Sequence, residues 1–335
     1  MEPVDQALSE PIEIGTLVLR NRIVLAPMSG VTDLPFRSLA WRYGAGLVVT
    51  EMVASRELVG NAAESWSRLK GSGITPHMVQ LAGREAHWMA EAAKIAAGHG
   101  ADAIDINMGC PAKKVTGGYS GSALMRDPDH ALSMIEATVK AVDIPVTLKM
   151  RLGWDENSIN APEIARRAEA AGVRMITIHG RTRMQFYQGK ADWDAIRAVR
   201  DAVSVPLVAN GDVETREDAH EILRRSGADI VMVGRSSQGR PWHPGVLAGA
   251  QAHPTQAEIA DIVAEHYAMM LEFYGVAAGL RHARKHLGWY LDRFAPSLGP
   301  LRKGEIMTSQ DPSFVAAAVA EALIAEHPVA TERAA

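Results

Sequence analysis

The chain has 335 residues, a formal net charge of −4 and a single cysteine. One cysteine excludes an internal disulfide framework and is typical of a reducing cytosol. The N-terminal segment MEPVDQALSE is acidic and has no apolar core, so we expect no signal peptide. No apolar run approaches the ~18 residues that a membrane helix needs. The small negative charge gives no global argument for nucleic acid, so such binding would need a local basic surface.

Short apolar runs recur along the first two thirds of the chain, each followed by a stretch of helical character. Glycine at a helix C-cap or proline at a strand start marks the joint before most of them. About eight such units in roughly 235 residues predict a (β/α)₈ TIM barrel, of the α/β class. A doubly wound sheet is the alternative, but the Gly-rich fingerprint after its first strand is missing. The runs are RIVLAP (22–27), GAGLVV (44–49), TPHMVQL (75–81), GADAIDI (100–106), IPVTLKM (144–150), GVRMITI (172–178), VPLVAN (205–210) and GADIVMV (227–233).

The pattern changes after the segment GRPWHPG (239–245). Residues 256–294 indicate helix, 296–304 a loop, and 311–327 a last helix with Asp311 as N-cap and Pro312 in its first turn. We therefore predict a barrel domain over 1–248, a small all-helical domain over 249–328 and a frayed tail over 329–335.

Polar residues follow nearly every predicted strand. In TIM barrels the chemistry gathers at the C-terminal ends of the strands, so a nearly complete polar ring predicts a site rather than a few helix caps. The ring comprises Met28, Glu51, Gln80, Asn107, Lys149 with Arg151, His179 with Arg181, Asn210 with Asp212, and Gly234 with Arg235.

The last two strands end in glycine-containing turns, ANGD (209–212) and VGRSSQGRP (233–241). Such turns form the usual phosphate pocket of this fold, with main-chain N–H groups and Arg235 as anion donors. The ligand could be flavin mononucleotide (FMN), pyridoxal phosphate or a sugar phosphate. Lys149 fits either a Schiff base or the negative charge of a reduced flavin. No metal site is expected, because His179, Cys110 and the carboxylates lack ligand spacing.

The motif series resembles that of the tRNA-dihydrouridine synthases. The motifs LAPMSGVTDLPFR, TEMV, VQLAG, DINMGCPAKKV, LKMRLGW, IHGRTR, ANGDV and VGRSSQGRPW follow in order. MGCPAKKV and RKHLGWYLDRF (284–294) are closest to the bacterial B-type branch. One position departs from the family loop, which commonly reads Ala-Gly-Ser-Ala-Leu, because Ser120 replaces the first alanine.

The resemblance implies an FMN-binding barrel and a helical tRNA-binding domain in a cytoplasmic enzyme. No membrane partner is expected, and nothing in the sequence indicates a stable protein partner. The family reduces the C5–C6 double bond of particular uridines in tRNA, and NADPH reduces the flavin. By motif, FMN would be bound by Ala26, Pro27, Met28, Gln80, Lys149, His179, Asn210, Asp212, Gly234 and Arg235. Substrate would be contacted by Asn107, Arg151 and Arg181. Lys113 and Lys114 directly follow Cys110, so we expect them to contact the tRNA backbone beside the reacting base. Arg281, Arg284 and Lys285 are three and four residues apart and share a helix face, which predicts a basic patch for tRNA.

In the implied reaction, hydride passes from reduced flavin to uridine C6, and Cys110 delivers a proton to C5 from the opposite face. An ordinary thiol has a pKa near ~8.5 and is protonated at neutral pH, which suits a general acid. A thiol protease would need a positioned histidine and would leave Lys149 unexplained, whereas an inert structural thiol is a further alternative. Other functions left open are FMN-dependent reduction of a small molecule and flavin-dependent regulation of RNA.

Overall fold

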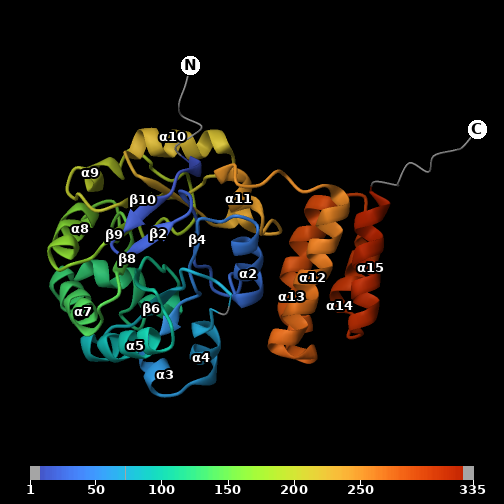
Figure 1. Ribbon diagram of the computed structural model, residues 1–335, viewed down its shortest axis with the longest axis horizontal. Helices are drawn as coiled ribbons and strands as arrows, with labels where there is room; N and C mark the ends of the chain where they lie inside the picture. Colours follow the sequence, from blue (N-terminus) through green and yellow to red (C-terminus); the bar gives the residue numbers. More distant parts are fainter. Residues whose placement is uncertain (1–7, 72, 327–335) are drawn as a thin grey trace, which may run out of the picture. The chain divides into compact units, whose positions relative to one another are not determined.

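The computed structural model describes residues 8–71 and 73–326, which form two compact units (Figure 1). The barrel unit comprises the residues up to Ser236 together with His243–Gln251, and the helical unit comprises Ser237–Trp242 and the residues from Ala252 onward. The predicted tail over 329–335 lies outside the described residues. Among the helices that the structure describes, none is long and apolar enough to cross a membrane.

The barrel unit contains, within the described residues, a parallel sheet of nine strands that closes on itself. Strand β11 pairs with β3, Val231 opposite Ile23, and β6 pairs with β5 and is bridged to Val49 just after β4. Because β4 and β5 are two pieces of one barrel position, the predicted (β/α)₈ barrel is confirmed. The strands are β3 (Ile23–Leu25), β4 (Leu47–Val48), β5 (Val53–Ala54), β6 (Met78–Ala82), β7 (Ala103–Met108), β8 (Val146–Arg151), β9 (Met175–His179), β10 (Leu207–Asn210) and β11 (Ile230–Val233).

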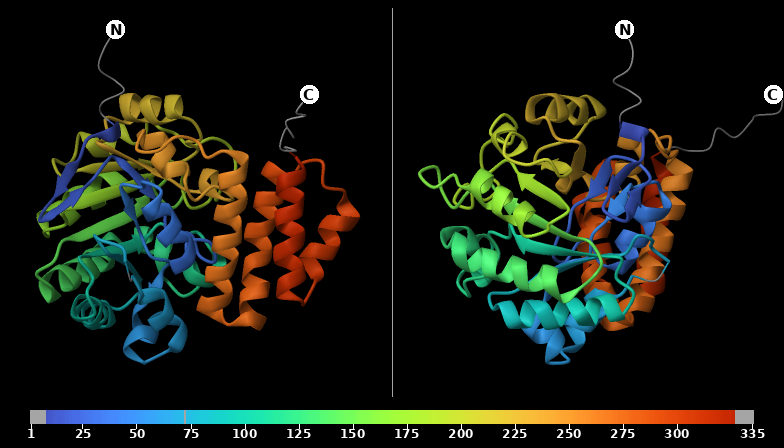
Figure 2. Two further views of the ribbon diagram at one scale, coloured as in Figure 1. Left: turned by 45° about the vertical axis from the view of Figure 1, so that its right-hand side comes forward. Right: turned by 60° about the vertical axis from the view of Figure 1, so that its left-hand side comes forward.

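Helices connect the strands and lie around the outside of the sheet (Figure 2). Gly227, at the joint before β11, is left-handed with φ 69° and ends the preceding helix, as the glycine signal predicts. The main barrel helices are α2 (Leu34–Arg42), α3 (Ser55–Val59), α4 (Ala63–Leu69), α5 (Ala86–Gly98), α7 (Pro128–Ala141), α8 (Ala161–Ala170), α10 (Arg216–Ser226) and α11 (His243–Ala248). Shorter turns are α6 (Lys113–Thr116), α9 (Arg197–Arg200) and the 3₁₀ turns η1 (Gly121–Arg126) and η2 (Arg235–Ser237).

The interior of the barrel is apolar at one end and polar at the other. Val24, Met78 and Met175 form an inner cluster with a short hairpin of strands β1 (Ile12–Ile14) and β2 (Leu17–Leu19), which the sequence patterns did not predict. Because side chains alternate along a strand, the inward positions two and four residues further on belong to the same face. The first such position after Met78 is Gln80, and those after Met175 are Thr177 and His179, so polar groups gather toward the C-terminal ends of these strands.

The helical unit contains α12 (Gln256–Tyr274), α13 (Val276–Phe294), α14 (Pro300–Thr308) and α15 (Pro312–Ala325). The single predicted helix over 256–294 is two helices, because Gly275, with φ 75° and ψ 158°, separates them. The loop predicted over 296–304 ends early, since α14 begins at Pro300. Asp311 caps α15 as predicted, accepting from the N–H groups of Ser313 and Phe314.

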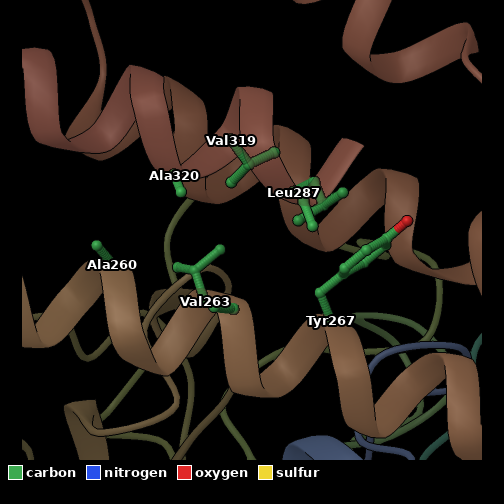
Figure 3. A pocket seen from close by; sticks show the side chains of 8 residues that line it. Ala260, Val263, Tyr267, Leu287, Val319 and Ala320 are labelled. Atoms are coloured by element: carbon green, nitrogen blue, oxygen red, sulfur yellow. The ribbon is translucent and has the colours of Figure 1, made fainter. Parts of the chain in front are cut away.

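Three of these helices enclose a small apolar cavity of about 10 Å³, roughly the size of one water molecule. Figure 3 shows Val263 and Tyr267 from α12, Leu287 from α13 and Val319 from α15 around it. A cavity of this size and composition is a packing gap in the core of the helical unit.

Candidate active site

A chain of hydrogen bonds runs through the polar end of the barrel interior. Thr147 Oγ1 donates to Asp105 Oδ1 at 2.6 Å, and Gln80 Nε2 donates to Asp105 Oδ2 at 2.7 Å. Asn107 Nδ2 then donates to Gln80 Oε1 at 2.8 Å, and the Cys110 main-chain N–H donates to Asn107 Oδ1 at 3.1 Å. The sequence prediction of Gln80, Asn107 and Cys110 as one site is consistent with this geometry. The sequence-based prediction did not include Asp105, although side chains alternate along a strand and Asp105 therefore lies on the same face of β7 as Asn107.

Lys149 lies beside this chain, on the inward face of β8. Its ammonium donates to Asn210 Oδ1 at 3.2 Å, and the residue is only 8% exposed. Burial and the nearby Arg151 charge lower the pKa of Lys149 from 10.5 to about 8, against the opposing effect of Asp105 and Cys110. A buried ammonium with spare N–H groups favours an anionic or strongly accepting ligand.

Cys110 is held in the loop between β7 and η1. Its carbonyl oxygen accepts from Ser122 N at 3.1 Å and from Ser122 Oγ at 2.9 Å. Gly121 has φ 62°, and a Cβ there would lie 2.8 Å from the Cys110 oxygen. The close approach of η1 to Cys110 therefore requires glycine at this position.

Burial raises the pKa of the Cys110 thiol, although a hydrogen bond from Ala112 and the charges of Arg151 and Lys149 act to lower it. The group is therefore a protonated thiol at neutral pH. The two lysines that follow it are in α6. Lys113 is exposed, and the side chain of Lys114 lies outside the described residues.

Arg151 and Arg181 are both about 1% exposed and are committed to protein acceptors. Arg151 donates to the carbonyl oxygens of Gly109, Thr182 and Phe186, which ties the Cys110 loop to the loop after β9. Burial, followed by the charge of Arg181, lowers the pKa of Arg151 to about 10. Arg181 forms a two-pronged ion pair with Asp212 and also donates to main-chain oxygens of the β9 loop. Their role as substrate contacts stays a prediction.

His179 is a neutral imidazole whose Nδ1 has no partner among the described residues and can donate. Burial, together with the charges of Arg151, Lys149, Arg181 and Arg235, lowers the pKa of His179 well below its ordinary value. Its Nε2 lies 3.3 Å from Arg181 Nη1. Because a guanidinium can only donate, Nε2 accepts and the ring proton is on Nδ1.

The ends of β10 and β11 carry unpaired main-chain donors. Within the described residues, the N–H groups of Gly211, Asp212, Gly234 and Arg235 have no acceptor. The half-exposed Arg235 guanidinium contacts Asp212 Oδ1 at 3.1 Å. Burial acts to raise the pKa of Asp212, but hydrogen bonds from Arg181 and Ala191 and the charges of Arg181 and Arg235 outweigh it and lower that pKa. Four N–H groups beside a guanidinium suit a phosphate.

The segment after β3 adjoins this phosphate-binding end. A Cβ at Gly234 would lie 3.6 Å from Met28 Sδ and 3.7 Å from Ala26 Cβ. The structure therefore brings the predicted Ala26–Met28 segment next to the predicted phosphate end. It also places Tyr187, which no sequence pattern marked, with its ring 4.9 Å from the Arg235 guanidinium carbon and 6.4 Å from the His179 ring.

The basic residues predicted to bind tRNA lie on α13. Arg281 is exposed, Arg284 and Lys285 are half-buried, and none of the three is in an ion pair with another described residue. By contrast, Arg302 pairs with Glu305 and Glu321. Three unpaired cations on one helix face give a local positive surface on a chain of net negative charge.

Comparison with known proteins identifies the family. The model for "Dihydrouridine synthase (Dus)" matches residues 24–321. A protein named probable tRNA-dihydrouridine synthase, from Rhizobium leguminosarum bv. phaseoli, is 78% identical over 305 residues, covering 91% of this chain and 96% of that protein. The tRNA-dihydrouridine synthase B of Vibrio cholerae is 45% identical over 287 residues, covering 84% and 89%.

Among solved structures, morphinone reductase superposes with a TM-score of 0.55 at 14% identity, over 76% of this chain and 93% of that one. At that identity the likeness concerns the fold alone, and it agrees with the barrel described above. The family model and the sequence relatives carry the assignment. The chain belongs to the dihydrouridine synthase family, as its motifs predict.

Proposed function

We propose that this protein reduces the C5–C6 double bond of specific uridines in cytoplasmic tRNA to 5,6-dihydrouridine, with bound FMN and with NADPH as its reductant. Family membership supports the reaction class. The observation that carries the proposal for this chain is a half-buried, protonated thiol at the mouth of a barrel whose other polar groups suit a phosphorylated, pyrimidine-like ligand.

The residues of the site fit FMN. The unpaired N–H groups at the ends of β10 and β11, with Arg235, would hold its phosphate. Lys149, Gln80 and His179 offer donors to the carbonyl groups of its ring, and the Ala26–Met28 segment would lie along it. When bound and reduced, FMN supplies the hydride.

Cys110 holds and releases the proton. Burial keeps the thiol protonated, whereas the charges of Arg151 and Lys149 stabilise the thiolate that forms when the proton leaves. Those two opposing influences suit a general acid, which must hold its proton until the transition state. The proton goes to uridine C5 as hydride reaches C6, so the ring gains two hydrogens and the thiolate is reprotonated from solvent.

Substrate binding would use two surfaces. Asn107 has a second amide N–H that could donate to the extruded uracil, since a base stacked in tRNA must leave the stack to react. The tRNA phosphates would be held by Lys113 and Lys114 near the thiol and by Arg281, Arg284 and Lys285 on α13.

Assay of the purified protein tests the proposal. We expect a flavin absorption spectrum, and dihydrouridine formed from unmodified tRNA when NADPH is present. A variant in which Arg281, Arg284 and Lys285 are all glutamate should lose tRNA affinity by at least about tenfold. Arg302→Gln is the matched control, because Arg302 is already paired with Glu305 and Glu321.

Two outcomes favour the other functions. Reduction of small enones or free pyrimidines with equal tRNA binding in the triple variant and the wild type would indicate a small-molecule reductase. Binding of flavin and tRNA with no dihydrouridine formed would indicate a regulator.

A further inference from the structure

Asp105 is a buried carboxylate that has no part in the proposed reaction. It lies on β7 and is 3% exposed, with both oxygens in hydrogen bonds, to Thr147 and to Gln80. Burial raises the pKa of Asp105, and the two hydrogen bonds and the positive charge of Lys149 act against that rise. A carboxylate in the barrel interior is costly, so its position needs a reason.

The chemistry of Asp105 sets the direction of the whole hydrogen-bond chain. In the carboxylate form, Asp105 Oδ2 can only accept from Gln80, so Gln80 presents its nitrogen to Asp105 and its oxygen to Asn107. Asn107 must then present its nitrogen to Gln80, which leaves its oxygen for the Cys110 N–H. Because the Cys110 N–H can only donate, the chain is consistent at both ends in this one direction.

We propose that Asp105 is a positioning residue that fixes the side-chain amides of Gln80 and Asn107 and thereby holds the Cys110 main chain at the site. The role of Cys110 as a proton donor rests on the proposed function. The positioning of its main chain by Asp105 rests on the hydrogen bonds alone. Among the described residues, the same arrangement leaves each amide with one N–H that has no partner. A ligand with acceptor atoms would suit these donors, and the carbonyl groups of flavin and uracil both supply such atoms.

The Cys110 amide gives a direct readout. Because the chain has a single cysteine, protein labelled with ¹⁵N-cysteine gives one backbone amide signal, whose hydrogen-exchange rate reports the bond to Asn107 in the full-length protein. Asp105→Ala should accelerate this exchange about tenfold, the effect of weakening one hydrogen bond. Asp105→Asn, which keeps an oxygen for Gln80, should stay within about threefold of wild type.

Epistasis shows whether Asp105 acts through Gln80. Gln80→Leu should accelerate exchange about as much as Asp105→Ala, and the double variant should be no faster than either single variant. Thr147→Val is the matched control, since it leaves the Asp105 to Gln80 bond in place, and its exchange should be unchanged. Val208→Ala, in the apolar inner cluster, controls for general destabilisation and should not loosen Cys110 selectively.

Two results would overturn the proposal. One is wild-type exchange of Cys110 in Asp105→Ala, and the other is a double variant whose effect is the product of the two single effects. If Asp105→Ala fails to fold, Asp105→Leu fills the volume without an acceptor and is read in the same way. These measurements need neither tRNA nor turnover. If the wild-type protein formed no dihydrouridine, the proposed function would be overturned and this inference would remain intact.

Discussion

Replacing Lys149 by methionine should stabilise the flavin-free protein while weakening FMN binding. The ammonium is buried in the barrel and interacts with the charge of Asp105, and among the described residues its one acceptor is Asn210 Oδ1. Methionine is similar in length and has no charge to desolvate. We therefore expect Lys149 to lower the stability of the flavin-free protein while it strengthens ligand binding.

The magnitude follows from the pKa. A pKa lowered from 10.5 to about 8 corresponds to a penalty of about 3 kcal/mol for the charged form in the folded protein. Loss of the bond to Asn210, which leaves a buried acceptor unpaired, offsets about 1–2 kcal/mol, whereas the attraction to Asp105 is already contained in that pKa. We expect Lys149→Met to raise the free energy of unfolding by about 1–2 kcal/mol at pH 7.

The stability difference between the wild type and Lys149→Met should depend on pH, in a direction that the pKa shift fixes. Because the folded pKa lies below the unfolded value, the penalty is complete below pH 8 and disappears as pH rises toward 10.5. Wild-type stability should therefore gain on that of the variant by about 1 kcal/mol between pH 8 and 9.

Urea unfolding of flavin-free protein at pH 7, 8 and 9 measures this difference, and FMN titration should show an affinity lower by about 10- to 100-fold. Lys140→Met, at an exposed lysine paired with Glu136, is the control and should change stability by less than about 0.5 kcal/mol. A destabilised Lys149→Met, or a difference that does not change with pH, would refute the reasoning.

Two further predictions concern packing and pH. Gly121→Ala should lower the free energy of unfolding by about 1–3 kcal/mol and speed alkylation of Cys110, because the left-handed backbone and the Cys110 oxygen both oppose a Cβ. Gly98→Ala, in helix α5 with no atom near its Cβ, should instead stabilise the protein slightly. Equal changes of the melting temperature in the two variants would contradict this prediction. Burial lowers the pKa of His266 to about 3, so wild-type stability should fall by up to about 1.4 kcal/mol per unit below pH 6.5. His266→Phe should be less sensitive to acid in parallel unfolding titrations, and equal sensitivity would argue against the buried imidazole as the cause.

The barrel could be predicted from the sequence because its strands are marked by repeated local signals. Glycine ends a helix or proline starts a strand at nearly every joint, and both act within a few residues. The β1–β2 hairpin has only short strands, Ile12–Ile14 and Leu17–Leu19, too short for a periodic pattern to stand out. Gly275 is itself the signal for the break between α12 and α13. It was passed over because the helical pattern continues on both sides of it.

The site could be predicted only as far as strand ends can indicate it. Gln80, Asn107 and Lys149 lie one or two residues before the C-terminal ends of their strands, and the region near those ends is where the rule looks. Asp105 lies one inward position deeper, so a search of strand ends passes over it. The partners of Arg151 and Arg181 are largely main-chain oxygens of distant loops, and no residue type in the sequence marks a carbonyl group as an acceptor.

The central claim is that Cys110 protonates a uridine within the barrel, and single-turnover kinetics test it most directly. Protein loaded with reduced flavin is mixed with unmodified tRNA, and flavin oxidation and dihydrouridine are followed together. We predict that the two rise together in the wild type. Cys110→Ala should bind flavin and tRNA normally but react at least about 100-fold more slowly, the usual contribution of a general acid. A Cys110→Ala protein that forms dihydrouridine at the wild-type rate would contradict the account.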